Sequence, residues 1–215
     1  MTTVLSLFDG ISCAQVALRA AGIAYETCIS VEIAPLARSV TQVNFPDTIH
    51  LNDVCLVSYR DGALYYDGEV VMPLDPGRTI VTGGSPCQGF SIAGKQMNFN
   101  DPRSRLYFEF ERIVGEIRPK AWLLENVKMK KEWVHIISTR MGRPAIRIDS
   151  KFFTPLSRPR WYWFSWDLPA DTIPTVAKTM EGIFDTTDNI EKFTVTLSEK
   201  ALARMDAIAK RHKQG

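Results

Sequence analysis

Short apolar runs alternate with amphipathic stretches along the first part of the chain. Residues 4–7 (VLSL) and 27–31 (TCISV) are rich in aliphatic and β-branched side chains and predict buried strands. Residues 14–21 and 35–44 place apolar side chains at helical spacing. This β-α-β-α order predicts a mostly parallel sheet with helices on both faces, in which ligands bind beyond the carboxyl ends of the strands.

The same pattern continues to about residue 166. Helical spacing returns at residues 106–117, and further strands are predicted at residues 79–81, 121–124, 145–148 and 161–164. Residues 61–72 (DGALYYDGEVVM) carry an Asp-Gly pair between apolar runs, which predicts a β-hairpin. We therefore expect an α/β fold, a doubly wound Rossmann-like sheet, as a single domain over residues 1–166.

The pattern changes from residue 167 onward. A polar, proline-bearing stretch comes first, and Thr196 and Glu199 then form a capping box that opens a final helix ending near Arg211. We expect residues 167–215 to form a connector and a short C-terminal helix, which packs on its own domain or on a partner.

Composition narrows the class of protein. The 215 residues are 45% hydrophobic and 23% charged, the balance of a globular chain. No apolar run approaches the ~20 residues needed to span a bilayer, and the N-terminal residues lack a signal-peptide pattern, so we expect a cytoplasmic protein.

The four cysteines form no C-x-x-C pair, so we expect free thiols and no metal site. Cys13, Cys28 and Cys55 are expected to be buried packing residues.

Charge is unevenly distributed, although the net charge is only +2. Only Glu132 and Asp149 oppose the basic residues of segment 128–160, which either offers phosphates a positive face or is an ordinary solvated surface. Its basic residues are Lys128, Lys130, Lys131, Arg140, Arg143, Arg147, Lys151, Arg158 and Arg160.

Cys87 is the first candidate for chemistry, because the segment TGGSPCQGFS places it after a proline, among glycines, just beyond a predicted strand. Such a loop can expose a thiolate nucleophile. A cysteine hydrolase would need a histidine partner, and His50, His135 and His212 stand in no recognisable context of that kind. The overlapping GFSIAGK matches a phosphate-binding loop, but Gln96 follows where a hydroxyl is needed to hold magnesium.

Glu125 is the second candidate. It ends the buried strand of WLLENV, at the edge of the sheet where Cys87 is also expected. A carboxyl group near apolar neighbours retains its proton more readily, which suits a proton donor to a ring nitrogen. A purely structural carboxylate is the alternative.

These segments together resemble the DNA cytosine-5 methyltransferases, in a prokaryotic or phage form similar to the de novo animal enzymes. The resemblance covers about residues 4–184. It runs in order through LSLFDGISCAQVALRAAGI, SVEIA, HLNDV, GGSPCQGFS, DPRSRLYFEF, LLENV and SRPRWYW.

The resemblance implies a DNA (cytosine-5-)-methyltransferase that uses S-adenosyl-L-methionine and acts on a cytosine flipped out of double-stranded DNA. In that family the cysteine corresponding to Cys87 adds to carbon 6 of the base, and the glutamate corresponding to Glu125 contacts the N3 edge. Arg158 and Arg160 would help to hold the base. The DNA-contacting residues implied are Gln88, Ser91 and Arg103.

The resemblance also implies a cofactor site. Glu32 would hold the ribose hydroxyls and Asp53 the adenine amine, although alone the first could be a helix N-terminal acid and the second a turn residue. Ile33 and Val54 would pack against the adenine ring. The full set is Phe8, Asp9, Gly10, Ile11, Glu32, Ile33, Asp53, Val54, Pro86 and Leu106.

The sequence departs from the family pattern in three places. Ser12 and Ala14 stand where glycine is common, and Leu156 replaces a glutamine. No target recognition domain or last conserved block is visible.

Three functional hypotheses remain. The chain is a methyltransferase, active alone or completed by a second polypeptide that supplies recognition; a non-catalytic DNA-binding relative; or a truncated relative that binds cofactor without turnover.

Overall fold

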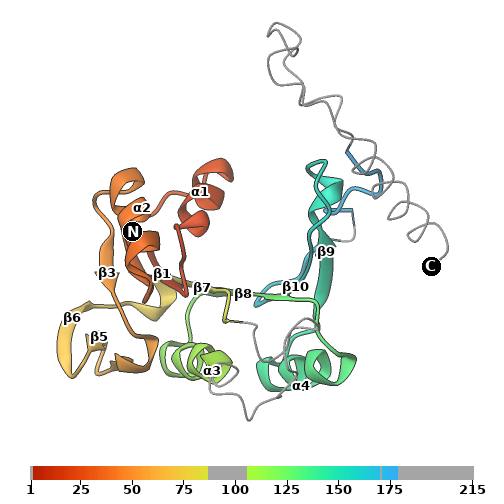
Figure 1. Cartoon of the computed structure of the whole chain (residues 1–215). Coiled ribbons are helices and arrows are strands. Elements are labelled where there is room, and N and C mark those ends of the chain that lie inside the picture. Colours follow the sequence, from red (N-terminus) through yellow and green to blue (C-terminus); the bar gives the residue numbers. More distant parts are fainter. Residues whose placement is uncertain (1, 87–105, 170, 179–215) are drawn as a thin grey trace, which may run out of the picture. The chain divides into compact units, whose positions relative to one another are not determined.

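Seven strands form one mixed sheet in the order β3-β2-β1-β7-β8-β10-β9 (Figure 1). The computed structural model describes residues 2–86, 106–169 and 171–178. The strands are β1 Thr3–Leu7, β2 Thr27–Val31, β3 Ile49–Leu51, β7 Thr79–Gly83, β8 Ala121–Val127, β9 Ile146–Asp149 and β10 Pro159–Phe164. Neighbours from β3 to β8 are parallel, whereas β10 is antiparallel to both β8 and β9. The predicted doubly wound α/β sheet is confirmed, with an antiparallel corner at one side.

Helices cover both faces of this sheet. Figure 1 shows α1 and α2 on one side and α3 and α4 on the other. The Trp122 ring of β8 meets Phe110 of α3 edge-on, with 6.4 Å between centroids, and the Trp163 indole of β10 donates to Ser138 Oγ of α4 at 2.9 Å. The helices are α1 Cys13–Ala20, α2 Pro35–Asn44, α3 Leu106–Ile117 and α4 Lys131–Met141, with short 3₁₀ turns at Val54–Leu56, Pro76–Arg78 and Ser150–Phe152. None of the helices in the described part of the chain has the length and apolar content needed to cross a bilayer.

A separate three-stranded antiparallel sheet contains the predicted hairpin. Its strands are β4 Val57–Arg60, β5 Ala63–Tyr66 and β6 Glu69–Pro73. Asp67 and Gly68 make the β5–β6 turn with φ values of 50° and 83°, the left-handed conformation that such a turn requires. Arg112 of α3 donates to the Val57 carbonyl at 2.8 Å, which fixes this small sheet to the helix.

Two of the three described cysteines are more exposed than predicted. Cys28 is buried, and burial raises the pKa of its thiol to about 12. Cys13 and Cys55 are exposed, so the expectation of burial was wrong for these two: one begins α1 and the other lies in the 3₁₀ turn after β3. All three are free thiols, as predicted.

The chain divides into one unit spanning Met1–Lys178 and another spanning Thr179–Gly215. The second unit, with the predicted C-terminal helix, lies outside the described residues. Within the first, the Lys178 backbone N–H donates to the Lys151 carbonyl at 2.7 Å. The division expected at residue 166 stays a prediction.

Candidate active site

One row of the large sheet marks the place where its parallel strands end. The residues paired across that row are Leu51, Val31, Leu7, Gly83 and Leu124. The residues that come next in their strands or loops therefore lie along the same edge, and they include Phe8, Glu32, Gly84 and Glu125. Beyond Leu124, strand β8 is paired only with β10, so Glu125 lies where the parallel part of the sheet gives way to the antiparallel corner.

The loop after β1 is held from inside the fold. The Asp9 carboxylate accepts hydrogen bonds from the hydroxyls of Ser6 and Ser30, two buried residues on β1 and β2. Phe8 and Gly10 on either side have positive φ values of 55° and 59°. Asp9 therefore anchors the turn, and the backbone around it forms the surface of the loop.

Ser12, one of the two positions where glycine was expected, adopts the left-handed conformation with φ 65° and ψ 41°. Glycine reaches this conformation without a steric cost, which gives a physical reason for its frequency there. Here the serine is fully buried and its hydroxyl accepts a hydrogen bond from Gln15 Nε2 at 2.9 Å. That bond offsets part of the backbone strain.

Glu32 connects two of the predicted cofactor loops. Its Oε2 accepts from the Gly10 backbone N–H and its Oε1 from the Ala34 backbone N–H, both at 2.8 Å. Each carboxylate oxygen can accept a second hydrogen bond, and the side chain is only partly buried. The Glu32 carboxylate thus fits the paired hydroxyls of a ribose, with Ile33 beside it in the chain and 70% exposed.

The remaining predicted cofactor residues differ from one another in exposure and in hydrogen bonding. Asp53 Oδ1 accepts from the Cys55 backbone N–H at 2.9 Å, so it caps the 3₁₀ turn. Val54 is 5% exposed and belongs to the core, whereas Ile11 is 52% exposed. Pro86 and Leu106 border the segment 87–105 and are partly buried.

Glu125 is held among side chains. Its Oε1 lies 2.9 Å from Arg160 Nε, an ion pair, although the N–H does not point at the oxygen. The other oxygen lies over Gly84, where an added Cβ would be 3.0 Å from it. Burial raises the pKa of the Glu125 carboxyl, and the positive charges of Arg160 and Arg158 oppose that rise without cancelling it. Such a carboxyl can act as a hydrogen-bond donor at higher pH than an exposed one.

Asn126 is a buried polar residue beside the candidate site that sequence reasoning missed. It is 1% exposed, and its Nδ2 donates to Ser85 Oγ at 3.0 Å across the β7–β8 boundary. Ser85 lies two residues before Cys87 in the chain. The available signal was an amide at an inward position of a strand whose other inward residues, Trp122 and Leu124, are apolar.

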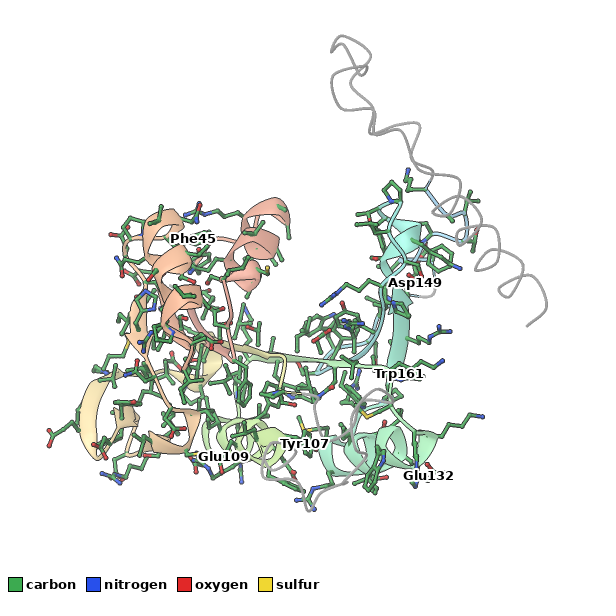
Figure 2. The ribbon with its side chains drawn as sticks, viewed as in Figure 1. Phe45, Tyr107, Glu109, Glu132, Asp149 and Trp161 are labelled. Carbon is green, nitrogen blue, oxygen red and sulfur yellow. The ribbon has the colours of Figure 1, made fainter. Side chains whose placement is uncertain are left out.

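Four predicted site residues lie outside the described residues: Cys87, Gln88, Ser91 and Arg103. Arg158 is exposed, and its backbone N–H donates to Asp149 Oδ1 at 2.9 Å. Asp149, labelled at the end of β9 in Figure 2, also accepts from Ser157 Oγ and from the Lys151 N–H. It therefore shapes the segment that carries Arg158.

The positive charge of the basic segment 128–160 is partly neutralised by carboxylates from elsewhere in the chain. Arg140 pairs with Glu111 at 2.7 Å, and Arg143 with Asp167 at 2.5 Å. Arg160 faces Glu125, as described above. A positive face toward phosphates stays a prediction for the other six residues, which are Lys128, Lys130, Lys131, Arg147, Lys151 and Arg158.

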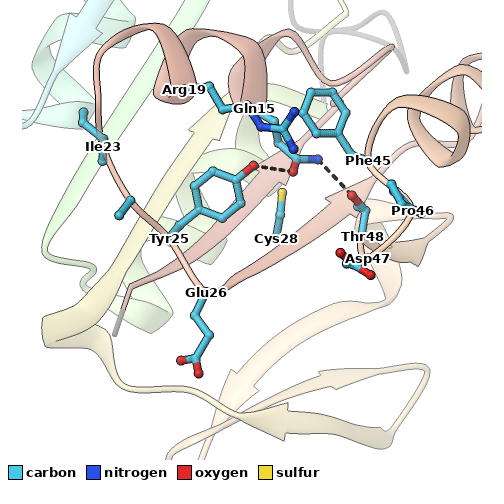
Figure 3. Close-up of a pocket in the computed structure, with 11 residues that line it drawn as sticks. Gln15, Arg19, Ile23, Tyr25, Glu26, Cys28, Phe45, Pro46, Asp47 and Thr48 are labelled. Atoms are coloured by element: carbon cyan, nitrogen blue, oxygen red, sulfur yellow. Dashed lines mark hydrogen bonds between the residues drawn. The ribbon is translucent and has the colours of Figure 1, made fainter.

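A cavity of about 340 Å³ lies elsewhere, where α1 and the end of α2 meet the start of β2 (Figure 3). Gln15 spans it: its Oε1 accepts from the Tyr25 hydroxyl at 2.7 Å, and its Nε2 donates to Thr48 Oγ1 at 2.9 Å. Arg19 and Cys28 also line it. No predicted site residue does, and it lies at the amino ends of the strands, away from Glu32 and Glu125.

The chain is similar in sequence to known DNA methyltransferases. Residues 2–133 match the family model of C-5 cytosine-specific DNA methylases. The chain is 36% identical over 131 residues to the type II methyltransferase M.AquIA of Picosynechococcus sp., covering 60% of this chain and 50% of that one. It is 32% identical over 172 residues to the orphan methyltransferase M.SPRI of Bacillus phage SPR, covering 74% and 36%.

Solved structures agree in fold. A protein described as a DNA modification methyltransferase encoded within an E. coli prophage superimposes with a TM-score of 0.61 at 25% identity, over 83% of this chain and 52% of that one. A mutant of Spodoptera frugiperda DNMT2 gives a TM-score of 0.54 at 21% identity, over 89% and 62%. The chain spans half or less of the length of the two methyltransferases M.AquIA and M.SPRI. With the family model matched over more than half of its residues, the chain belongs to the C-5 cytosine-specific DNA methylase family.

Proposed function

We propose that the protein is a DNA (cytosine-5-)-methyltransferase that acts on double-stranded DNA. The observation that carries the proposal is the Glu125–Arg160 pair, which faces Gly84 at the edge where the parallel strands end. Gly84 leads through Ser85 and Pro86 directly to Cys87. A partly buried carboxyl with a raised pKa thus lies beside the segment that carries the nucleophile.

We assign the methyl donor as S-adenosyl-L-methionine, which supplies an electrophilic methyl group when bound. Glu32 would hold its ribose hydroxyls, and Ile33 and Asp53 would receive the adenine. Support comes from the spare acceptor capacity of the Glu32 carboxylate and from the exposure of Ile33.

The chain's own groups would activate the base. The Cys87 thiolate forms a bond to carbon 6 of a flipped-out cytosine, and Glu125 donates a hydrogen bond to N3, which stabilises the charge that moves into the ring. Carbon 5 then accepts the methyl group, loses its proton to a base, and the sulfur–carbon bond breaks to restore the thiolate. Flipping costs a few kcal/mol, which contacts from Arg158, Arg160 and phosphate-binding residues offset.

A second candidate is a catalytically incomplete relative that binds cofactor or DNA and needs a partner chain. Helix α2 favours it, because Leu36, Val40 and Val43 follow one another at helical spacing and are 84%, 42% and 82% exposed. We propose that a second polypeptide covers this stripe and supplies target recognition. The relatives named above come from a bacterium and a Bacillus phage, so we place the activity in the cytoplasm of a bacterial or phage-infected cell.

Tritiated methyl transfer from S-adenosylmethionine to mixed-sequence duplex DNA tests the proposal. Cys87→Ser and Glu125→Gln should each lower incorporation at cytosine by about 100-fold or more, because one removes the nucleophile and the other the proton donor. Glu69→Gln, at an exposed position on β6, is the matched control and should leave the rate unchanged. A folded protein that binds cofactor and transfers no methyl group would refute the first candidate and favour the second.

A further inference from the structure

Tyr162 of β10 faces the candidate site from a strand interior. It is the direct cross-strand partner of Glu125 on β8, so both side chains lie on the same face of the sheet. In such a pair the two Cβ atoms are about 5 Å apart. Arg160, two residues earlier on β10, lies on that face as well and forms the ion pair with Glu125.

This face is the one that α3 and α4 leave free. The side chains that meet those helices are Trp122 and Trp163, which alternate with Glu125 and Tyr162 along their strands. Tyr162 therefore does not belong to the core packed against α3 and α4. Its side chain is partly exposed.

The ring of Tyr162 packs against a neighbouring ring on the same strand. It stacks on Phe164, with centroids 6.0 Å apart and planes inclined by 10°, and Phe164 is 7% exposed. Within the described residues the hydroxyl makes no hydrogen bond. Burial and the neighbouring Glu125 carboxylate raise the pKa of the phenol, so it stays a neutral donor.

We propose that Tyr162 contacts the target base, its phenol hydroxyl donating a hydrogen bond to the O2 carbonyl of the cytosine whose N3 edge meets Glu125. The inference rests on the proposed function and extends it to a further recognition residue. A phenol on a ring clamped by Phe164 loses little conformational freedom when it makes such a bond, which makes it a more selective contact than a long flexible side chain.

Removal of a single hydroxyl tests this contact. Tyr162→Phe keeps the stack on Phe164 and should lower the single-turnover rate of methyl transfer to duplex DNA about fivefold to tenfold, as expected for one hydrogen bond to the reacting base. Tyr65→Phe removes a phenol from the small sheet, on β5, and is the matched control. Thermal unfolding and cofactor affinity should be the same for both variants and the wild type.

DNA affinity is measured in parallel, with a mixed-sequence duplex and an A·T-only duplex of equal length. Wild type and Tyr65→Phe should prefer the cytosine-containing duplex, and Tyr162→Phe should lose about fivefold of that preference. A Tyr162→Phe protein equal to wild type in both assays overturns the inference, whether or not the wild type transfers methyl groups. A wild type that prefers cytosine-containing DNA but transfers nothing overturns only the proposed function.

Discussion

Glu32 and Glu125 lie at the same edge of one sheet, yet the protein holds them in different ways. Glu32 accepts hydrogen bonds from two backbone N–H groups in the loops after β1 and β2. Glu125 pairs with the side chain of Arg160 from an antiparallel strand, and its other oxygen lies over Gly84. The proposed cofactor side is therefore built from loops at the ends of parallel strands, and the proposed base side from the faces of strands.

The difference extends to the buried amides behind each carboxylate. Gln15, on the cofactor side, joins Ser12, Tyr25 and Thr48 in a network that faces the cavity and not the site. Asn126, on the base side, is the immediate neighbour of Glu125 and bonds to the residue two before Cys87. We therefore expect the buried amide on the proposed cofactor side to contribute to stability alone, and the one on the proposed base side to help place Cys87 as well.

The largest expected effect comes from the strand between the two sides. A Cβ on Gly83 of β7 would lie 2.8 Å from the Phe110 ring and 3.1 Å from the Leu7 carbonyl oxygen. Phe110 is fully buried and Leu7 is paired backbone, so neither can move easily. Gly83→Ala should lower the free energy of unfolding by about 1–3 kcal/mol, as overpacking does.

Gly115 supplies the control for this change in urea unfolding experiments. It lies in α3 with nothing within 4 Å of an added Cβ, so Gly115→Ala should stabilise the protein by about 0.5–1 kcal/mol. Equal unfolding midpoints for Gly83→Ala and wild type would show that Phe110 or Leu7 can move to accept the added methyl group. They would contradict the view that β7 rigidly separates the two sides of the sheet.

The fold was predictable where local chemistry sets it. α2 and α3 have the expected bounds, because helical spacing and, for α2, a proline in the first turn define them locally. β3 and α4 were not predicted. The three residues of β3 are too few to show an alternating pattern, and α4 begins inside a run of basic residues, where the helical spacing of apolar residues is not evident. The antiparallel direction of β10 cannot be read from periodicity at all.

The candidate site divides in the same way. Strand order alone places the acid after β2 beside the loop after β1, and Glu32 and Gly10 do meet. The Arg160–Glu125 and Asn126–Ser85 contacts join segments 35 and 41 residues apart through the pairing of β8 with β10 and β7. Sequence reasoning named Glu125 from its place at the end of a buried strand and Arg160 from the family resemblance. It missed Asn126, because the role of a buried amide can be inferred only once its partner is known.

Alanine substitutions at the two amides sharpen the comparison. Asn126→Ala and Gln15→Ala should each cost about 1–3 kcal/mol of unfolding free energy, because each leaves buried partners without a hydrogen bond. Only Asn126→Ala should also lower the single-turnover rate of methyl transfer at a temperature where both variants remain folded. A Gln15→Ala protein that loses the same fraction of activity would contradict the assignment of separate roles.

The smallest expected effect concerns Asp149, a carboxylate on the base side that is held by backbone N–H groups, as Glu32 is. Burial alone would raise the pKa of its carboxyl, but hydrogen bonds from the Lys151 N–H, the Ser157 hydroxyl and the Arg158 N–H outweigh it and lower the pKa below its usual value of 3.8. Asp149→Asn should therefore loosen the segment that carries Arg158 at neutral pH and lower the unfolding midpoint slightly.

The stability contributions of Asp149 and Glu125 should change with pH in opposite directions. Because the folded pKa of Asp149 is depressed, the unfolded chain binds its proton first, so the stability contributed by the carboxylate is complete above its usual pKa and is lost as pH falls through the lower folded value. The difference in unfolding midpoint between wild type and Asp149→Asn should shrink as pH falls below 3.8. Asp171→Asn, at an exposed position, is the matched control. For Glu125 the raised pKa reverses the sign: relative to Glu125→Gln, the wild type loses stability as pH rises from the usual carboxyl range through the folded pKa. Parallel pH profiles for the Asp149 and Glu125 pairs would mean that the protein holds both carboxylates in the same way.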